Sequence, residues 1–183
     1  AIWTVETDLL PCLVEMTERG IRVDVDQAER TKQELMRREK LVRKRIKEIA
    51  GKEVEIWAGA SIAKAFDAAS IPYPKTEKGS PSFTKKFLED HPAELAQRIV
   101  EARNLNKIQG TFIDSILRFV ATDGRVHGHI NQLRSEGGGA VSGRLSMNNP
   151  NLQQIPARDP ELGPMIRRLF LPEEGEQWAA VDF

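Results

Sequence analysis

The sequence predicts an α+β fold in which a mainly helical part, with two long antiparallel helices, is followed by the first strands of a sheet-based part. Residues 27–50 and 92–120 each repeat apolar residues at helical spacing. Shorter pieces separate these stretches, so the two helices can fold back on each other as an antiparallel pair. After the turn signal Asp123-Gly124, strand-like alternation and irregular loops replace the helical pattern. We therefore expect a domain boundary near residue 122.

The composition is typical of a soluble globular protein. Hydrophobic residues make up 40% and charged residues 30% of the chain, and the formal net charge is zero. The overall charge therefore gives no argument for binding nucleic acid or a membrane. The chain has neither the roughly 18 consecutive apolar residues of a membrane span nor a recognisable signal peptide, so we expect a cytoplasmic protein without a membrane partner. The single cysteine, Cys12, is expected in the core.

The N-terminal region is expected to form one helix and one short extended segment. A helix over residues 6–19 can end at Gly20. Residues 21–25 alternate as in a strand, and Asp26 can cap the helix that follows. The apolar stripe of the first helix consists of Leu9, Leu10, Leu13, Val14 and Met16.

The helix over residues 27–50 is the most strongly patterned element, and Gly51 can end it. It carries nine Lys or Arg against four Glu, so the zero net charge conceals a locally basic surface. Such a surface is more often a solvated helix face than a binding surface. Its apolar face consists of Leu35, Val42, Ile46 and Ile49.

Shorter elements lie between the two long helices. A small helix is expected over residues 61–69, followed by a break at the prolines of 71–74 and a polar loop over 75–82. Either Ser82 or Thr84 can cap a short helix that ends at residue 89.

The second long helix can begin at Pro92 and continue to about Val120. Beyond the boundary, residues 125–132 predict a strand, and residues 169–171 and 177–182 predict two strands that flank a turn. The face of the helix expected to be buried consists of Leu95, Ile99, Ala102, Leu105, Phe112, Ile116 and Phe119.

Residues 131–158 combine a flexible triplet of glycines at 137–139 with many amide and guanidinium side chains. Amides both donate and accept hydrogen bonds, and Arg carries a rigid fork of donors, so the set suits a surface that follows phosphates, sugars and groove edges. Contacts in the minor groove can test base-pair shape without reading sequence. A polar loop with structural Asx turns explains this composition equally well. The set consists of Arg144, Ser146, Asn148, Asn149, Asn151, Gln153, Gln154 and Arg158.

These residues also carry a resemblance to the family A DNA polymerases, the DNA polymerase I type. The most specific stretches are Ser-Gly-Arg-Leu-Ser at 142–146 and Pro-Asn-Leu-Gln-Gln-Ile-Pro at 150–156. Residues 166–170 and 181–183 are similar to the segment that enters the first palm motif of that family. Further similar stretches, at the start of the polymerase region and in the second thumb helix, lie at residues 6–10, 20–24 and 102–107.

The resemblance implies a division into polymerase subdomains. Residues 1–25 correspond to a helix and extended segment at the base of the palm, 26–122 to the thumb, and 123–183 to the N-terminal part of the palm. The thumb of this family grips the primer-template duplex behind the growing end. The long loop over residues 133–141 is similar to loops of phage-type members.

The resemblance also implies individual DNA contacts. Arg144 matches a residue that reaches the minor groove near the primer terminus, and Arg158 one near the primer end and the incoming nucleotide. Arg103 and Lys107 match thumb positions that touch primer phosphates, with solvated charges as the alternative. Further candidate contacts are Asn151, Gln153 and Gln154 along the template and primer backbones, Lys75, Lys78, Lys85 and Lys86 at the thumb tip, and Gln132.

Asp182 is the candidate catalytic residue. On residue type alone it is more often a strand-end cap than a metal ligand, but it matches the first of two palm aspartates that hold a pair of Mg²⁺ ions. The main-chain carbonyl of Phe183 matches a further metal ligand. In the complete enzyme, two ions about 3.5–4 Å apart activate the primer hydroxyl and stabilise the leaving pyrophosphate. The three histidines show no metal-ligand spacing.

The sequence therefore predicts the thumb and early palm of a DNA polymerase that takes deoxynucleoside triphosphates. The isolated chain is expected to be inactive, because it lacks a second palm aspartate and a triphosphate-binding fingers helix, and a C-terminal polymerase fragment is a candidate partner. A non-catalytic DNA-binding accessory protein with a polymerase-derived thumb is the alternative. A structural helical-hairpin scaffold is a third interpretation.

Overall fold

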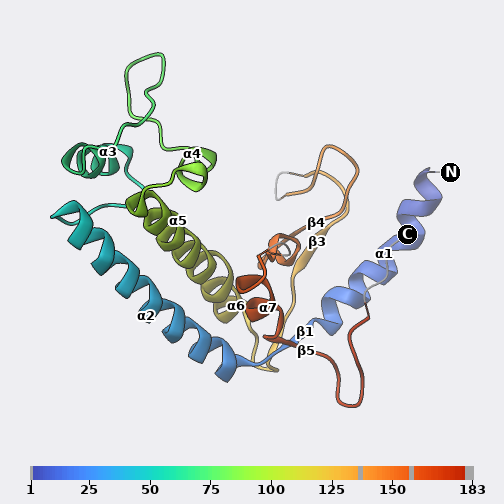
Figure 1. Cartoon of the computed structure of the whole chain (residues 1–183). Coiled ribbons are helices and arrows are strands. Elements are labelled where there is room, and N and C mark those ends of the chain that lie inside the picture. The colour runs from blue at the N-terminus through green and yellow to red at the C-terminus, as the bar shows by residue number, and fades with distance from the viewer. Residues whose placement is uncertain (1, 136–137, 157–158, 180–183) are drawn as a thin grey trace. The chain divides into compact units, whose positions relative to one another are not determined.

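The computed structural model divides into two compact units. The first unit combines residues 1–32 with 110–183, and the second unit is the continuous stretch 33–109. The fold is α+β, as predicted, with small antiparallel sheets beside long helices (Figure 1). The residues that the structure describes are 2–135, 138–156 and 159–179.

The first unit begins with helix α1 (Ile2–Arg19), which ends at Gly20 as predicted. Gly20 adopts a φ of +61°, and a Cβ there would lie 2.7 Å from the His127 ring, so only glycine fits this turn. Strand β1 (Ile21–Val23) follows and confirms the short extended segment.

Helix α2 (Val25–Ala50) confirms the longest predicted helix, but its cap differs from the prediction. The Asp24 carboxylate accepts a hydrogen bond from the backbone N–H of Gln27 at 2.8 Å. Asp24 is therefore the N-cap residue, and Asp26 lies inside the first turn. The prediction was two residues late because the apolar alternation continues through Val25 although the strand has already ended.

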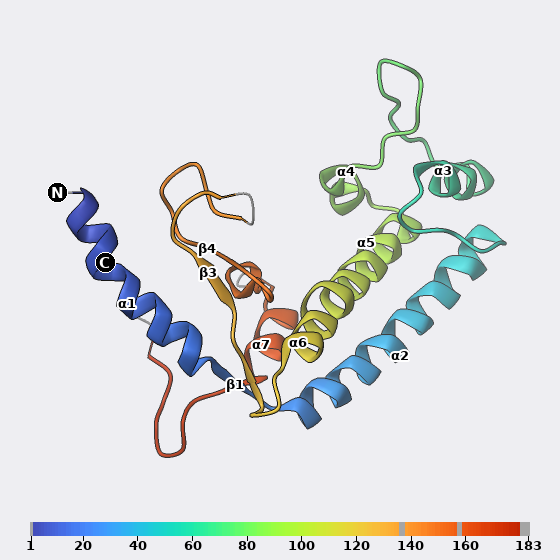
Figure 2. The ribbon, with the colours of Figure 1, turned by 180° about the vertical axis from the view of Figure 1, so that it is seen from behind.

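The second unit contains the rest of α2 together with α3 (Gly59–Ala68), α4 (Lys85–Asp90) and α5 (Glu94–Lys107). Thr84, and not Ser82, caps α4 by accepting from Phe87 N at 3.2 Å. The two long helices lie side by side in both views (Figures 1 and 2). The core of this unit includes Leu35, Val42, Ile46, Ile56, Ile62, Phe66, Leu88, Leu95, Ile99 and Leu105.

Ion pairs and hydrogen bonds confirm that α2 and α5 are antiparallel. Arg45 near the end of α2 pairs with Glu94 at the start of α5 at 2.8 Å, and Glu39, earlier in α2, accepts from Asn106 at 3.2 Å near the end of α5. The C-terminal part of α2 thus contacts the N-terminal end of α5, and an earlier part of α2 contacts the C-terminal end of α5, so the two helices run in opposite directions.

The second long helix is interrupted where the sequence predicted one continuous element. It begins at Glu94, two residues after Pro92, and passes through a π-helical segment, η1 (Ile108–Ile113), into α6 (Asp114–Phe119). The extra residue per turn of a π segment shifts the register of the helix. The predicted buried face is nevertheless correct, except that Phe119 is only half-buried.

The strands of the first unit form two small antiparallel sheets. In the order β2-β1-β5, strand β1 lies between β2 (Arg125–Val126) and β5 (Phe170–Leu171). The other sheet pairs β3 (His129–Asn131) with β4 (Ser146–Asn148). The remaining helical pieces of this unit are η2 (Leu152–Gln154) and α7 (Leu162–Arg167).

Two strand predictions need correction. The strand expected over 125–132 is broken at Gly128, where a Cβ would lie 2.9 Å from the Met147 sulfur. Residues 177–179, the described part of the strand expected over 177–182, are irregular. A strand forms only by pairing with a neighbour, and no described segment pairs with these three residues.

The face of α1 is less buried than its apolar pattern predicted. Leu13 is 5% exposed, whereas Leu10 and Val14 are 53% and 47% exposed. Cys12 is also exposed, which corrects its expected place in the core. The apolar arc of this helix is wider than the surface that covers it. None of the helices in the described part of the chain has the length and apolarity needed to cross a membrane.

Candidate nucleic-acid interface

The amide-rich loop of the first unit is held together by its own amides. The Asn151 side chain accepts from Gln153 N at 3.2 Å and caps the 3₁₀ turn η2. The side chain of Gln153 then donates to the carbonyl of Leu145 at 3.2 Å. These bonds include the Asx turn anticipated for the loop, and they fix η2 beside the residue that follows Arg144.

Arg144 lies on the surface just before β4. Its side chain is exposed and forms no hydrogen bond or ion pair with the described residues. The neighbouring Gln154 is also exposed. A guanidinium in this position keeps its five N–H donors available to an external acceptor such as a phosphate or a base edge.

Gln132 follows β3 and uses its amide within the protein. The amide nitrogen donates to the carbonyl of Glu6 at 2.7 Å and also to the Glu6 carboxylate. This contact joins the end of β3 to α1, which gives Gln132 a structural role; its contact with DNA stays a prediction.

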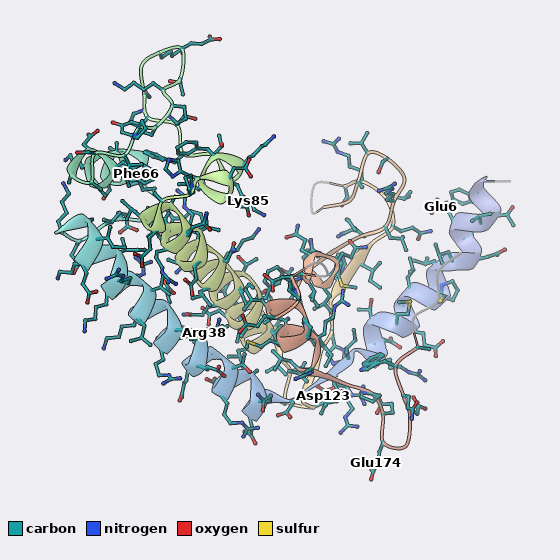
Figure 3. The ribbon with its side chains drawn as sticks, in the orientation of Figure 1. Glu6, Arg38, Phe66, Lys85, Asp123 and Glu174 are labelled. Carbon is teal, nitrogen blue, oxygen red and sulfur yellow. The ribbon has the colours of Figure 1, made fainter. Side chains whose placement is uncertain are left out.

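The second unit brings three of the predicted cations around one pocket. Lys85 lies on α4 (Figure 3). Arg103 and Lys107 lie one turn apart on α5 and line the same pocket. The sequence spacing did not reveal that α4 and α5 line one pocket together. The pocket has a volume of about 180 Å³ and is lined by Trp57, Lys85, Leu88, Val100, Arg103, Asn104 and Lys107.

Arg103 is half-buried beside this pocket, and its donors are used inside the unit. Its Nε donates to the Ile56 carbonyl at 2.7 Å, and an Nη1 donates to the Phe83 carbonyl at 3.4 Å. Burial lowers the pKa of Arg103, but a guanidinium stays charged at neutral pH. Arg103 therefore joins α5 to the segments before α3 and before α4, and its predicted phosphate contact stays a prediction.

Trp57 is the residue of this pocket that the sequence analysis missed. Trp57 is 54% exposed, and the Arg103 guanidinium carbon lies 5.1 Å from its ring centroid. The indole N–H donates to the Asn106 side chain at 3.1 Å, and Asn106 donates to Glu39 at 3.2 Å. A single Trp in an irregular segment gives no periodic signal, so only the fold could place it here.

The lysines of the predicted tip lie on and beside a turned loop. Lys75 pairs with Pro81 across an isolated bridge, which brings Lys78 to the exposed turn. Lys86 is exposed, and Lys85 lies 3.5 Å from Glu89 in an exposed ion pair. The buried ring of Phe66 packs against the rings that support this region (Figure 3). These rings are Tyr73, Phe83 and Phe87, at centroid distances of 6.2, 5.0 and 6.4 Å.

The basic surface of α2 is partly neutralised by neighbouring carboxylates. Lys32 pairs with Asp114 at 2.8 Å, and Lys47 pairs with Glu53 at 2.6 Å. The hydrogen bonds between Arg45 and Glu94 lower the pKa of this carboxyl. These pairs support the interpretation of α2 as largely a solvated and paired helix face.

The catalytic candidates are not part of the described chain. Asp182, Phe183 and Arg158 lie outside the described residues. Within the described ranges, no three His, Cys, Asp or Glu side chains come together in a way that could hold a metal ion.

Comparisons with known proteins agree with this fold. The chain is 38% identical over 195 residues to the DNA-directed DNA polymerase of Pseudomonas phage M6, covering 100% of this chain and 29% of that protein. It is 34% identical over 173 residues to DNA polymerase I of Geobacillus stearothermophilus, covering 92% of this chain and 19% of that protein. The chain thus spans less than one third of the length of these relatives.

A solved structure and a family model complete the comparison. The POL domain of Pol1 from M. smegmatis, solved in complex with DNA primer-template and dNTP, superposes with a TM-score of 0.74 at 30% identity, over 89% of this chain and 28% of that one. The family model for DNA polymerase family A matches residues 25–183. Because this model matches far more than half of the sequence, the chain belongs to DNA polymerase family A.

Proposed function

We propose that this chain is the thumb and early palm of a template-directed DNA polymerase and binds primer-template duplex. Residues 26–122 are assigned to the thumb, which includes the compact second unit, 1–25 to the base of the palm and 123–183 to its N-terminal part. The observation that supports duplex binding best is the exposed Arg144, held beside the η2 turn by Gln153 in a chain of this family.

The chain would also contribute to the catalytic site of the complete enzyme. Asp182 and the carbonyl of Phe183 are the proposed ligands of Mg²⁺, which when bound activates the primer hydroxyl for attack on a deoxynucleoside triphosphate. One carboxylate is too few to hold two ions, so the isolated chain should not extend primers.

Helix α1 supports a further protein partner. Trp3, Leu10 and Val14 are 82%, 53% and 47% exposed and share one face of the helix by their spacing, and Leu10 and Val14 line a pocket of about 260 Å³ between α1 and β3. Exposed large apolar side chains that gather on one face mark an interaction site. The proposed partner is the C-terminal part of the polymerase.

Binding of a labelled primer-template, followed by fluorescence anisotropy at several salt concentrations, tests the duplex contact. We expect the affinity for duplex to fall steeply as the salt concentration rises. Arg144→Gln should weaken binding, and if Arg144 contacts a phosphate the salt dependence should also fall by about one phosphate contact. If Arg144 instead contacts the minor groove, the affinity should fall with little change in the salt dependence. Arg118→Gln is the matched control, because Arg118 is an exposed arginine on α6 of the same unit. Equal affinities for the two variants, or binding insensitive to salt, would refute the proposal.

A further inference from the structure

The pocket between α4 and α5 joins an exposed aromatic ring to positive charge. Trp57, which is 54% exposed, lines this pocket together with Lys85, Arg103 and Lys107. No carboxylate belongs to this lining. Its volume of about 180 Å³ is below the roughly 300–1,000 Å³ of sites for drug-sized ligands. The pocket therefore suits one planar group that carries or adjoins a negative charge.

The indole of Trp57 is held in place before any ligand arrives. Its N–H is bonded to Asn106, which is bonded in turn to the buried Glu39. The Arg103 guanidinium lies near the ring and is itself fixed by the carbonyl of Ile56 at 2.7 Å. A ring whose orientation is already fixed loses little conformational entropy when a ligand stacks on it.

The two lysines of the pocket remain available for an anion. Lys107 is exposed and has no ion pair or hydrogen bond with the described residues. Lys85 has a 79% exposed side chain, and its ion pair with Glu89 at 3.5 Å is long and solvated. Exposed pairs of this kind contribute little, so a phosphate can displace Glu89 at small cost.

We propose that Trp57, Lys85 and Lys107 form a binding site for an unpaired DNA base and its adjoining phosphate, with the base stacked on the indole. An aromatic platform beside cations is the combination that binds single strands, because every base has a π face. A site for duplex phosphates alone needs only the cations. The inference rests on the proposed function, since its ligand is DNA, and it adds that the second unit holds a single-stranded segment.

Anisotropy with a labelled oligothymidylate and a matched duplex, measured on the 183-residue chain, tests this site. We expect Trp57→Ala to weaken single-strand binding about 5- to 150-fold, and Lys107→Gln to reduce its salt dependence. Trp57→Phe should retain most of the affinity because it keeps a stacking ring. Duplex affinity should stay within about twofold in both Trp57 variants.

Trp178→Ala is the matched control. Trp178 is 61% exposed and its indole N–H is also hydrogen-bonded, to the Phe170 carbonyl at 3.2 Å, but it belongs to the first unit. An unchanged far-UV circular dichroism spectrum shows that the Trp57 variants are folded. Trp57→Phe provides a second measurement, because this variant keeps an aromatic ring at position 57.

The outcomes separate this inference from the proposed function. Single-strand affinity that Trp57→Ala leaves unchanged, or lowers no more than Trp178→Ala does, overturns the base-binding site while duplex binding through Arg144 stands. Equal weakening of single-strand and duplex binding by Trp57→Ala also overturns it, because the residue would then be a general DNA contact. Absence of any DNA binding refutes both proposals.

Discussion

Arg103 illustrates how one half-buried charge can connect the segments of the second unit. Its guanidinium meets the carbonyls of Ile56 and Phe83 and the ring of Trp57, so three separate segments depend on one side chain. A carbonyl that loses a charged donor in a half-buried position is costly to leave unpaired, whereas an exposed lysine one turn away supports nothing in the described chain.

We expect Arg103→Met to lower the free energy of unfolding by about 1–3 kcal/mol, because hydrogen bonds from a charged donor to two carbonyls are lost. Lys107→Met, a matched change on the same helix, should stay within about 0.5 kcal/mol of the unchanged protein. Urea unfolding followed by circular dichroism measures both. Equal effects of the two changes would contradict the structural role of Arg103.

His127 should make stability depend on pH. Its Nδ1 lies 2.9 Å from the Thr17 carbonyl and its Nε2 lies 3.1 Å from the Asp123 carboxylate, and these acceptors, the carbonyl first, raise the pKa of His127 above its ordinary value. Both ring nitrogens donate only in the protonated form.

We therefore expect the stabilising contribution of His127 to be complete below the unfolded-state pKa of about 6.5 and to be lost as pH rises through the higher folded-state pKa. The difference in unfolding free energy between the unchanged protein and His127→Asn should shrink as pH rises above about 6.5. His129→Asn, at an exposed histidine on β3, is the matched control for replacing a histidine by asparagine. A pH-independent difference for His127→Asn would exclude this linkage.

Residue type alone predicted part of the candidate site. Arg144 and the amides around it could be identified as candidate DNA contacts because these polar residues lie close together in the sequence. Trp57 could not, because its importance comes from Arg103 and Asn106, which are 46 and 49 residues away in the sequence. The hydrogen bond from the Gln132 amide to the Glu6 carbonyl could not be predicted either, because 126 positions separate the two residues in the sequence.

At the scale of elements, the start of α2 depends on one carboxylate. Asp24→Ala should cost about 1 kcal/mol of unfolding free energy, because it removes the acceptor for the Gln27 N–H. Asp26→Ala should cost less, since Asp26 only meets the helix dipole from the first turn. Thermal unfolding of both variants compares them. A larger loss of unfolding free energy for Asp26→Ala than for Asp24→Ala would contradict the assignment of Asp24 as the N-cap residue and favour Asp26.

Two glycines of the long helices should respond in opposite ways to alanine. A Cβ on Gly110, in the η1 segment, would meet no atom within 4 Å, so Gly110→Ala should stabilise the protein by up to about 1 kcal/mol. Gly51 ends α2 with a φ of +69°, so Gly51→Ala should destabilise it by roughly 1 kcal/mol despite open space around it. Urea midpoints that shift in the same direction for both would contradict this reading.

Helices could be predicted more completely than strands, for a physical reason. The buried faces of α2 and α5 repeat locally, so periodicity finds them. The strands β1, β2 and β5 contain only two or three residues each, and they pair with partners about 100 to 150 positions away in the sequence. Sequence alternation therefore suggested a continuous strand over 125–132 and could not reveal the break at Gly128.

For the whole molecule, the boundary predicted from the sequence pattern differs from the limits of the two compact units. The sequence changes from helical to strand-like near residue 122, whereas the compact second unit covers 33–109, because α2 and the run from α5 to α6 each continue from one unit into the other. The subdomain limits at residues 26 and 122 stay a proposal. The exposed apolar arc of α1 is consistent with a chain that spans less than one third of its relatives.

We propose that this chain supplies the thumb, early palm and first metal-binding aspartate of a polymerase. Primer extension by a chimera, in which residues 1–183 replace the matching segment of the 38% identical Pseudomonas phage M6 polymerase, is the decisive experiment. We expect extension by the chimera and a loss of at least about a hundredfold with Asp182→Asn, because a metal ligand supplies several kcal/mol of transition-state stabilisation. Asp8→Asn, in α1, should leave the rate unchanged. A chimera that extends primers equally well with Asp182→Asn would contradict the claim.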